Sequence, residues 1–183
     1  MPKNKVYVFN ATLKARKGTW RRIEIKGNQT LGDLDHIMRK AFNHDIEDHL
    51  SEFFSGKVWE SEGFGEIEPG GNGVGAKEKI DELGLVDGST IKYVYDFGDD
   101  IQHVIKLEKV VEPVDGANYP RITSKNKPRN RYCVSCKKIQ NKTIATWICI
   151  DCTEEEHKQI LLCEDCLEDE HEGHYAEEIF SIK

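Results

Sequence analysis

Six cysteines and two histidines late in the chain stand at spacings typical of metal ligands. They form four pairs, each with two residues between its members: Cys133 and Cys136, Cys149 and Cys152, Cys163 and Cys166, and His171 and His174. A two-residue spacer lets both side chains of a pair face one ion, and tetrahedral Zn²⁺ takes two such pairs. The eight side chains therefore predict two closed structural zinc sites, with no position left open for a substrate.

The spacing alone leaves open which pairs share an ion, because adjacent pairs and alternating pairs would both complete two sites. Dithiol redox centres are a different use of paired cysteines. They usually stand at the start of a helix in a βαβ unit, which this segment lacks. A further histidine, His157, follows three glutamates. We expect it to face solvent in a charged turn, and the alternative is that it replaces His171 or His174 as a ligand.

The segment that contains TWICIDC and LLCEDCLEDEHEGH resembles ZZ-type and B-box-type zinc fingers. These modules use an alternating, cross-brace arrangement and recognise proteins or peptides. The resemblance implies one ion held by the first and third pairs, and a second ion held by the other two pairs. The first set is Cys133, Cys136, Cys163 and Cys166, and the second is Cys149, Cys152, His171 and His174.

Composition and charge limit the class of protein that this 183-residue chain can be. No apolar run approaches the ~20 residues that a helix needs to cross a bilayer, and the first residues lack the apolar core of a signal peptide. We therefore expect a cytoplasmic protein, in which thiols stay reduced and paired cysteines favour metal over disulfides. Residues 131–183 contain 12 acidic and 6 basic residues, so this region suits a phosphate backbone poorly.

Residues 1–118 have the pattern of an α+β domain. Alternating apolar residues predict a hairpin of two strands around residues 7–13 and 20–25. Thr30 is the expected N-cap of a helix whose apolar face runs from Leu34 to Ala41. These elements indicate a mostly antiparallel sheet with a packed helix, a β-grasp-like roll.

Further strands are expected at residues 53–59 and on both sides of a turn at Phe97 to Asp100. Residues 60–76, with six glycines and a proline, predict a long flexible loop. Residues 119–131 contain five basic residues, two prolines and no acidic residue, which is typical of an extended linker. A small zinc-finger domain should then occupy residues 132–183.

The run YVYDFGDDIQHVIKLE, from Tyr93 to Glu108, resembles the signature of the plasmid pRiA4b ORF-3-like family. Two further matches are LDHIMRKAF, which begins at Leu34, and YPR, which begins at Tyr119. The resemblance covers about residues 5–122 and implies a fold, because the family has no established biochemical activity. Ile101 stands where the family usually has Trp, and the basic linker and zinc module stand where members commonly continue into helices.

The same run contains acids and histidines that could hold a divalent ion or transfer protons, as in nucleases. The candidates are Asp96, Asp99, His103, Glu108 and His49. Strand alternation separates Asp96 and Glu108 from the others, which leaves Asp99, His103 and His49. The structural interpretation is favoured: Gly98 and Asp99 form the turn, and His103 is a hydrogen-bonded core residue.

These observations lead to a non-catalytic zinc-binding protein whose acidic finger module recognises a protein or peptide partner. An alternative is a nucleic-acid-binding accessory protein of plasmids or mobile elements, with phosphates contacted by Lys125, Lys127, Arg129 and Arg131. A small metal-dependent hydrolase or nuclease that uses the YDFGD run ranks lowest.

Overall fold

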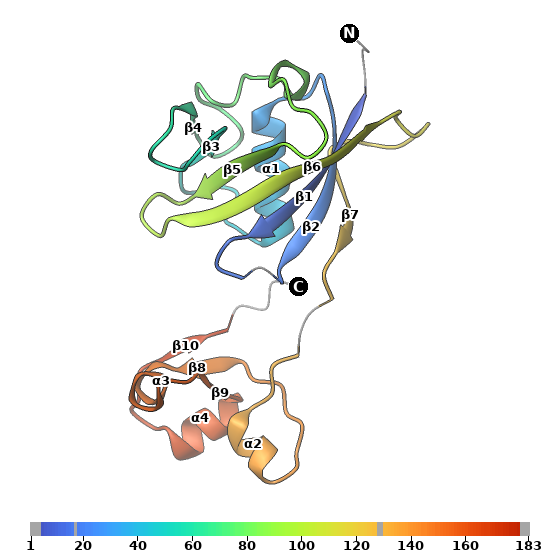
Figure 1. Ribbon diagram of the computed structural model, residues 1–183. Coiled ribbons are helices and arrows are strands. Elements are labelled where there is room, and N and C mark those ends of the chain that lie inside the picture. Colours follow the sequence, from blue (N-terminus) through green and yellow to red (C-terminus); the bar gives the residue numbers. More distant parts are fainter. Residues whose placement is uncertain (1–4, 17, 128–129, 180–183) are drawn as a thin grey trace. The chain divides into compact units, whose positions relative to one another are not determined.

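The computed structural model describes residues 5–16, 18–127 and 130–179 (Figure 1). The chain divides into two compact units, Met1–Asn126 and Lys127–Lys183, which are described separately. Within the described residues, no helix combines the length and apolar character needed to span a membrane.

The first unit is built on a seven-stranded sheet in the order β4-β3-β5-β6-β1-β2-β7. The strands are β1 (Val6–Leu13), β2 (Trp20–Lys26), β3 (Ser51–Phe54), β4 (Gly63–Ile67), β5 (Thr90–Tyr95), β6 (Ile101–Val111) and β7 (Arg121–Lys125). Each pair of neighbouring strands is antiparallel. Helix α1 (Leu31–Phe42) lies across one face of this sheet, which confirms the expected α+β class (Figure 1).

The start of α1 follows from its sequence. The Thr30 hydroxyl accepts a hydrogen bond from the backbone N–H of Asp33, and the Asp33 carboxylate accepts one from the backbone N–H of Thr30. This reciprocal capping box satisfies two amide groups that the first turn leaves without partners. The expected N-cap is thereby confirmed, and the apolar face from Leu34 to Ala41 is buried against the sheet.

Two expectations about strand positions were wrong in part. The strand expected at residues 53–59 is β3, which ends at Phe54. The predicted glycine loop contains β4, which pairs with β3. The glycines allow this return of the chain: a Cβ on Gly75 would stand 1.9 Å from the carbonyl oxygen of Gly65, so the two backbones could not approach with a larger residue there.

The segment predicted as a linker also contributes to the sheet. Residues 121–125 form β7, which pairs with β2 along the edge of the sheet. Arg121 donates a hydrogen bond of 2.8 Å to the Glu24 carboxylate. Basic residues and proline are typical of edge strands as well as of linkers, so composition alone did not separate the two.

The second unit contains a three-stranded antiparallel sheet in the order β10-β8-β9 and three short helices. The strands are β8 (Trp147–Cys149), β9 (Ile160–Leu162) and β10 (Ala176–Glu178). The helices are α2 (Val134–Lys138), α3 (Ile150–Glu156) and α4 (Glu164–Glu170).

A buried ion pair joins α1 to the first unit's sheet and to the loop that follows the helix. Arg39 Nε lies 2.8 Å from Asp35 Oδ2, and both side chains are 1% exposed. The Asp35 carboxylate also accepts hydrogen bonds from Ser51 on β3 and Tyr93 on β5. The Arg39 guanidinium donates to the carbonyls of three residues in the loop, which are Asp45, Asp48 and His49.

Replacing Asp35 with Ala should lower the free energy of unfolding of the first unit by about 3–5 kcal/mol, because Arg39 keeps its charge in a dry interior. Urea dependence of hydrogen exchange at β1 and β6 amides measures this unit alone. The control is Lys57→Ala, which breaks an exposed pair with Glu60 and should change stability by less than about 0.5 kcal/mol. Equal effects of the two substitutions would contradict the buried-pair account.

Candidate metal centres

The first cluster of ligands joins the cysteines of α2 and α4. Cys133 is the N-cap of α2 and Cys136 lies one turn into it. Cys163 and Cys166 occupy the same two positions on α4. The four sulfur atoms all lie within 4.8 Å of one another.

The second cluster joins α3 to the end of α4. Cys149 is the last residue of β8 and the N-cap of α3, and Cys152 lies in the helix. His171 is the C-cap of α4, and His174 follows it by one turn. The Nδ1 atoms of His171 and His174 both lie 3.3 Å from Cys152 Sγ, and His174 Nδ1 lies 3.5 Å from Cys149 Sγ.

These separations match the edges of a tetrahedron around a metal ion. Zn–S bonds of about 2.3 Å place two sulfur ligands about 3.8 Å apart, and Zn–N bonds of about 2.0 Å place sulfur and nitrogen about 3.5 Å apart. Cys136 Sγ lies 3.7 Å from Cys163 Sγ and 3.6 Å from Cys166 Sγ. Those distances are far longer than the ~2.05 Å of a disulfide. Both clusters therefore have the ligand types and spacing to hold a metal ion.

The structure brings the four sequence pairs together in alternating order. The first pair meets the third, and the second pair meets the fourth. His157 is absent from both groups, and it forms the left-handed C-cap of α3 with an exposed side chain. Helix α4 supplies ligands to both clusters, because Cys166 lies in the helix and His171 ends it.

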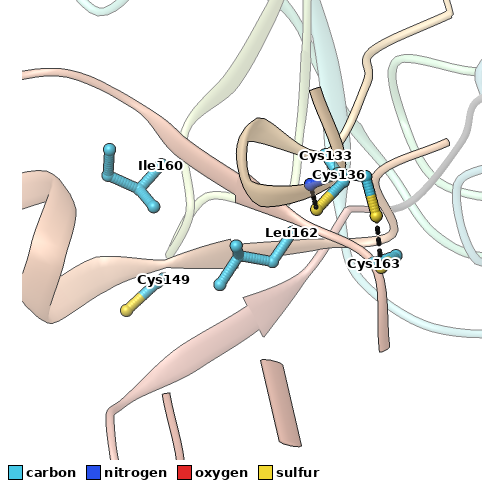
Figure 2. Packing of buried hydrophobic residues seen from close by; sticks show 6 residues of the cluster. All are labelled: Cys133, Cys136, Cys149, Ile160, Leu162 and Cys163. Atoms are coloured by element: carbon cyan, nitrogen blue, oxygen red, sulfur yellow. Dashed lines mark hydrogen bonds between the residues drawn. The ribbon is translucent and has the colours of Figure 1, made fainter. Parts of the chain in front are cut away.

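The ligands also make up most of the interior of the second unit. Its buried cluster consists of six residues, of which four are cysteines: Cys133, Cys136, Cys149, Ile160, Leu162 and Cys163. Figure 2 shows Leu162 between Cys149 on one side and the sulfur atoms of Cys133, Cys136 and Cys163 on the other. The apolar interior is thus a thin layer between the two clusters, and little apolar surface is left to hold the unit together.

Crowding of the thiols also affects their protonation. Burial, a hydrogen bond with Cys149 and the negative charge of that neighbour raise the pKa of Cys152 to about 11. Burial would also raise the pKa of Cys133, but hydrogen bonds from the backbone of Cys136 and Cys163 outweigh it and lower the pKa to about 7. The metal-free unit cannot hold all its sulfurs as thiolates, so metal binding must release protons.

The first unit does not assemble the remaining candidates into one site. The Nδ1 atom of His49 lies 3.1 Å from Asp96 Oδ2. Asp99 is exposed, and its backbone N–H donates to Asp96 Oδ1. Glu108 is 2.8 Å from Arg22 on the sheet. Outside the two Cys/His clusters, the described residues contain no group of three or more His, Cys, Asp or Glu side chains close enough to hold a metal ion.

His103 is a core residue, as expected, but its partner was not foreseen. Its Nε2 lies 3.2 Å from the Nε2 of His44, and its buried Nδ1 has no hydrogen-bond partner. His44 belongs to the loop held by Arg39 and stacks on Tyr95 at a ring separation of 4.3 Å. No spacing in the sequence relates His44 to His103, since the two meet only when the loop folds against β5 and β6.

Strand alternation separated Asp96 from His49 in the sequence, yet the two side chains are in contact in the structure. Strand alternation placed Asp96 on the face opposite Tyr95, but β5 ends at Tyr95. Asp96 has a left-handed backbone with φ of 57°, so the alternation of the strand no longer governs its side chain. His49, also left-handed with φ of 64°, meets it from the neighbouring loop.

Comparison with known proteins supports the fold and leaves the activity open. A profile of the family described as "Plasmid pRiA4b ORF-3-like protein" matches residues 5–163, which runs beyond the expected end near residue 122 and includes five of the six cysteines. The chain is also similar to the crystal structure of a protein of unknown function from Methanosarcina mazei Go1. The identity is 26%, the TM-score is 0.55, and the match covers 67% of this chain and 70% of that one. None of the curated proteins compared with the chain matches it.

The two buried histidines should make the first unit less stable in acid. Burial lowers the pKa of His44 to about 4, helped by the charge of Arg39, and burial lowers that of His103 to about 3, helped by His44. The unfolded chain binds these protons near pH 6.5, so between about pH 6.5 and 3 it holds more protons than the folded chain. The contribution of these two histidines to the free energy of unfolding should therefore be constant above pH 6.5. It should fall as the pH drops below 6.5.

The measurement is hydrogen exchange of β1 and β6 amides between pH 7 and pH 4.5. His103→Gln should reduce the slope of stability against pH. The control is His36→Gln, which replaces an exposed histidine on the outer side of α1 and should leave the slope as in the original chain. An unchanged slope in His103→Gln would contradict this account.

Proposed function

This chain belongs to the plasmid pRiA4b ORF-3-like family, and we propose that its second unit is a zinc-stabilised module that binds a protein or peptide partner. The observation that carries the proposal is the complete use of eight ligands in two four-membered clusters. A catalytic zinc keeps one position for water or substrate, whereas structural zinc is fully ligated by protein. The metal would therefore hold a recognition surface in place.

Zinc is the metal that these ligands favour. Thiolate sulfur selects Zn²⁺, Cu⁺ and iron–sulfur clusters over hard cations such as Mg²⁺ and Ca²⁺. A set of two thiolates and two imidazoles in tetrahedral arrangement is typical of zinc, and the Cys₄ set is equally common in structural zinc sites. The proposal places the protein in a reducing compartment, where such thiols remain available.

Nucleic acid is the alternative partner, and a run of basic residues at and after the end of β7 favours it. Lys125 is the last residue of β7, and Lys127 and Arg131 follow it in the sequence, while Arg129 lies outside the described residues. Phosphate-driven binding should weaken steeply between about 50 and 200 mM salt, because each neutralised phosphate releases a counterion. A mobility-shift titration with duplex DNA and RNA at both salt concentrations tests this. Absence of binding at the lower concentration would exclude the alternative.

Protein purified without chelator should contain close to two zinc ions per chain. Since most of the second unit's interior is made of ligands, removing the metal should unfold residues 130–179 and leave the first unit folded. Elemental analysis gives the metal content, and hydrogen exchange before and after chelation reports each unit separately. A metal-free second unit that keeps its amide protection would overturn the structural role.

Two matched double substitutions test the alternating pairing. Cys133→Ser with Cys163→Ser removes two ligands from one cluster, so the chain should keep about one zinc ion. Cys133→Ser with Cys149→Ser removes one ligand from each cluster, so both ions should bind far more weakly. Pairing of adjacent ligands would give the opposite order of metal contents in the two variants.

A further inference from the structure

Charge is separated along the second unit and the residues that lead into it. Residues 116–150 contain eight basic residues and no acidic one, whereas residues 151–178 contain twelve acidic residues and one basic residue. The acidity of the module therefore belongs to its later part alone. The segment 131–144, called the first knuckle below, carries four basic residues: Arg131, Lys137, Lys138 and Lys142.

The first knuckle also exposes three large apolar side chains. Ile139, directly after α2, is 76% exposed, Ile144 is 52% exposed and Tyr132 is 39% exposed. Tyr132 and Ile144 are partners in an isolated antiparallel bridge, so their side chains lie on the same side of it. Hydrogen bonds of 2.9 Å from Cys133 N–H to the Thr143 carbonyl and of 2.8 Å from Ala145 N–H to the Arg131 carbonyl hold this bridge in place.

A purely structural role explains part of the basic charge. Four thiolates and one Zn²⁺ would give the neighbouring Cys₄ cluster a net charge of −2, which nearby lysines would offset. Four basic side chains exceed that charge. Lys137, Lys138 and Lys142 are exposed, and no ion pair within the described residues joins any of the four to an acid. Charge balance also gives no reason for the exposed Ile139 and Ile144.

We propose that the first knuckle is the docking surface of the module, and that its partner is an acidic peptide segment with at least one large apolar side chain. This inference rests on the proposed recognition function and specifies the partner. The lysines attract carboxylates, and Ile139 together with the Tyr132–Ile144 pair covers the apolar side chain. Apolar burial supplies most of the affinity and charge supplies the orientation.

The two other partner classes fit these residues less well. A basic peptide would bind at the acidic part of the unit, residues 151–178. Tyr175 is the large apolar side chain exposed there among the described residues, and its hydroxyl already donates a hydrogen bond to Glu177. A nucleic acid would satisfy the lysines through its phosphates but leave Ile139 and Ile144 in water. The acidic peptide is the partner class that uses both the charge and the apolar surface.

The test is selection of a random twelve-residue display library on the zinc-loaded full chain. The selected peptides should have net negative charge and at least one large apolar residue. Selected peptides with net positive charge, or no enrichment of any peptide, would overturn the proposed docking surface. Positively charged peptides would still support a recognition module, so the docking surface and the proposed function fail separately. A labelled twenty-nucleotide single strand that binds more tightly than the best peptide would overturn both.

Substitutions then locate the binding surface on variants that retain two zinc ions. Ile139→Asp, and separately Lys137→Glu with Lys138→Glu, should weaken the selected peptide at least ten-fold in fluorescence anisotropy. Val86→Asp replaces an exposed apolar residue of the first unit, and Lys158→Glu reverses the one basic residue of the acidic part. These two controls should leave affinity within about two-fold. Equal losses in a control and its matched variant would contradict docking at the first knuckle.

Discussion

The second unit is constrained by its lack of apolar material. Ile160 and Leu162 are the two aliphatic members of its buried cluster, and the other four are cysteines of the two candidate metal sites. A segment of this size cannot offset the loss of conformational entropy with so little hydrophobic burial. In the function proposed above, coordination bonds to the metal would provide the missing stability, and the other features of the unit would depend on them. The short strands, the helices of five to seven residues and the exposed first knuckle are elements that would not persist alone.

In the first unit, a buried ion pair between Asp35 and Arg39 holds a loop against the sheet. Its apolar core is ample, yet Asp35 and Arg39 lie in its interior. The guanidinium gathers three loop carbonyls that would otherwise be hard to satisfy next to the sheet. A hydrophobic replacement could pack in the same space but could not hold this loop. The ion pair thus fixes the positions of His44 and His49, which explains how a fully buried charged pair can be useful despite its desolvation cost.

Local sequence patterns predicted the elements that local chemistry controls. Thr30 with Asp33 specifies the start of α1, and the two-residue spacers specify the four Cys/His pairs, because both depend on neighbours in the chain. Strand β4 was hidden in a glycine-rich stretch because it is formed by pairing with β3, and Gly65 in the strand also lets the chain at Gly75 approach closely. The His44–His103 contact joins residues 59 apart and depends on the complete sheet. The resemblance to cross-brace fingers favoured alternating ligand pairs, and spacing alone could not decide between the two schemes.

The alternating order has a consequence for how the chain is made. During synthesis, Cys133, Cys136, Cys149 and Cys152 leave the ribosome before any of their partners in the later part of the unit. These four thiols could together bind one zinc ion, but they belong to two different clusters in the folded unit. An ion captured early must therefore exchange ligands when Cys163, Cys166 and the two histidines emerge. If zinc binds before the chain is complete, the finished module would form by exchange of ligands on the early-bound ion, and free zinc during synthesis would affect how quickly it forms.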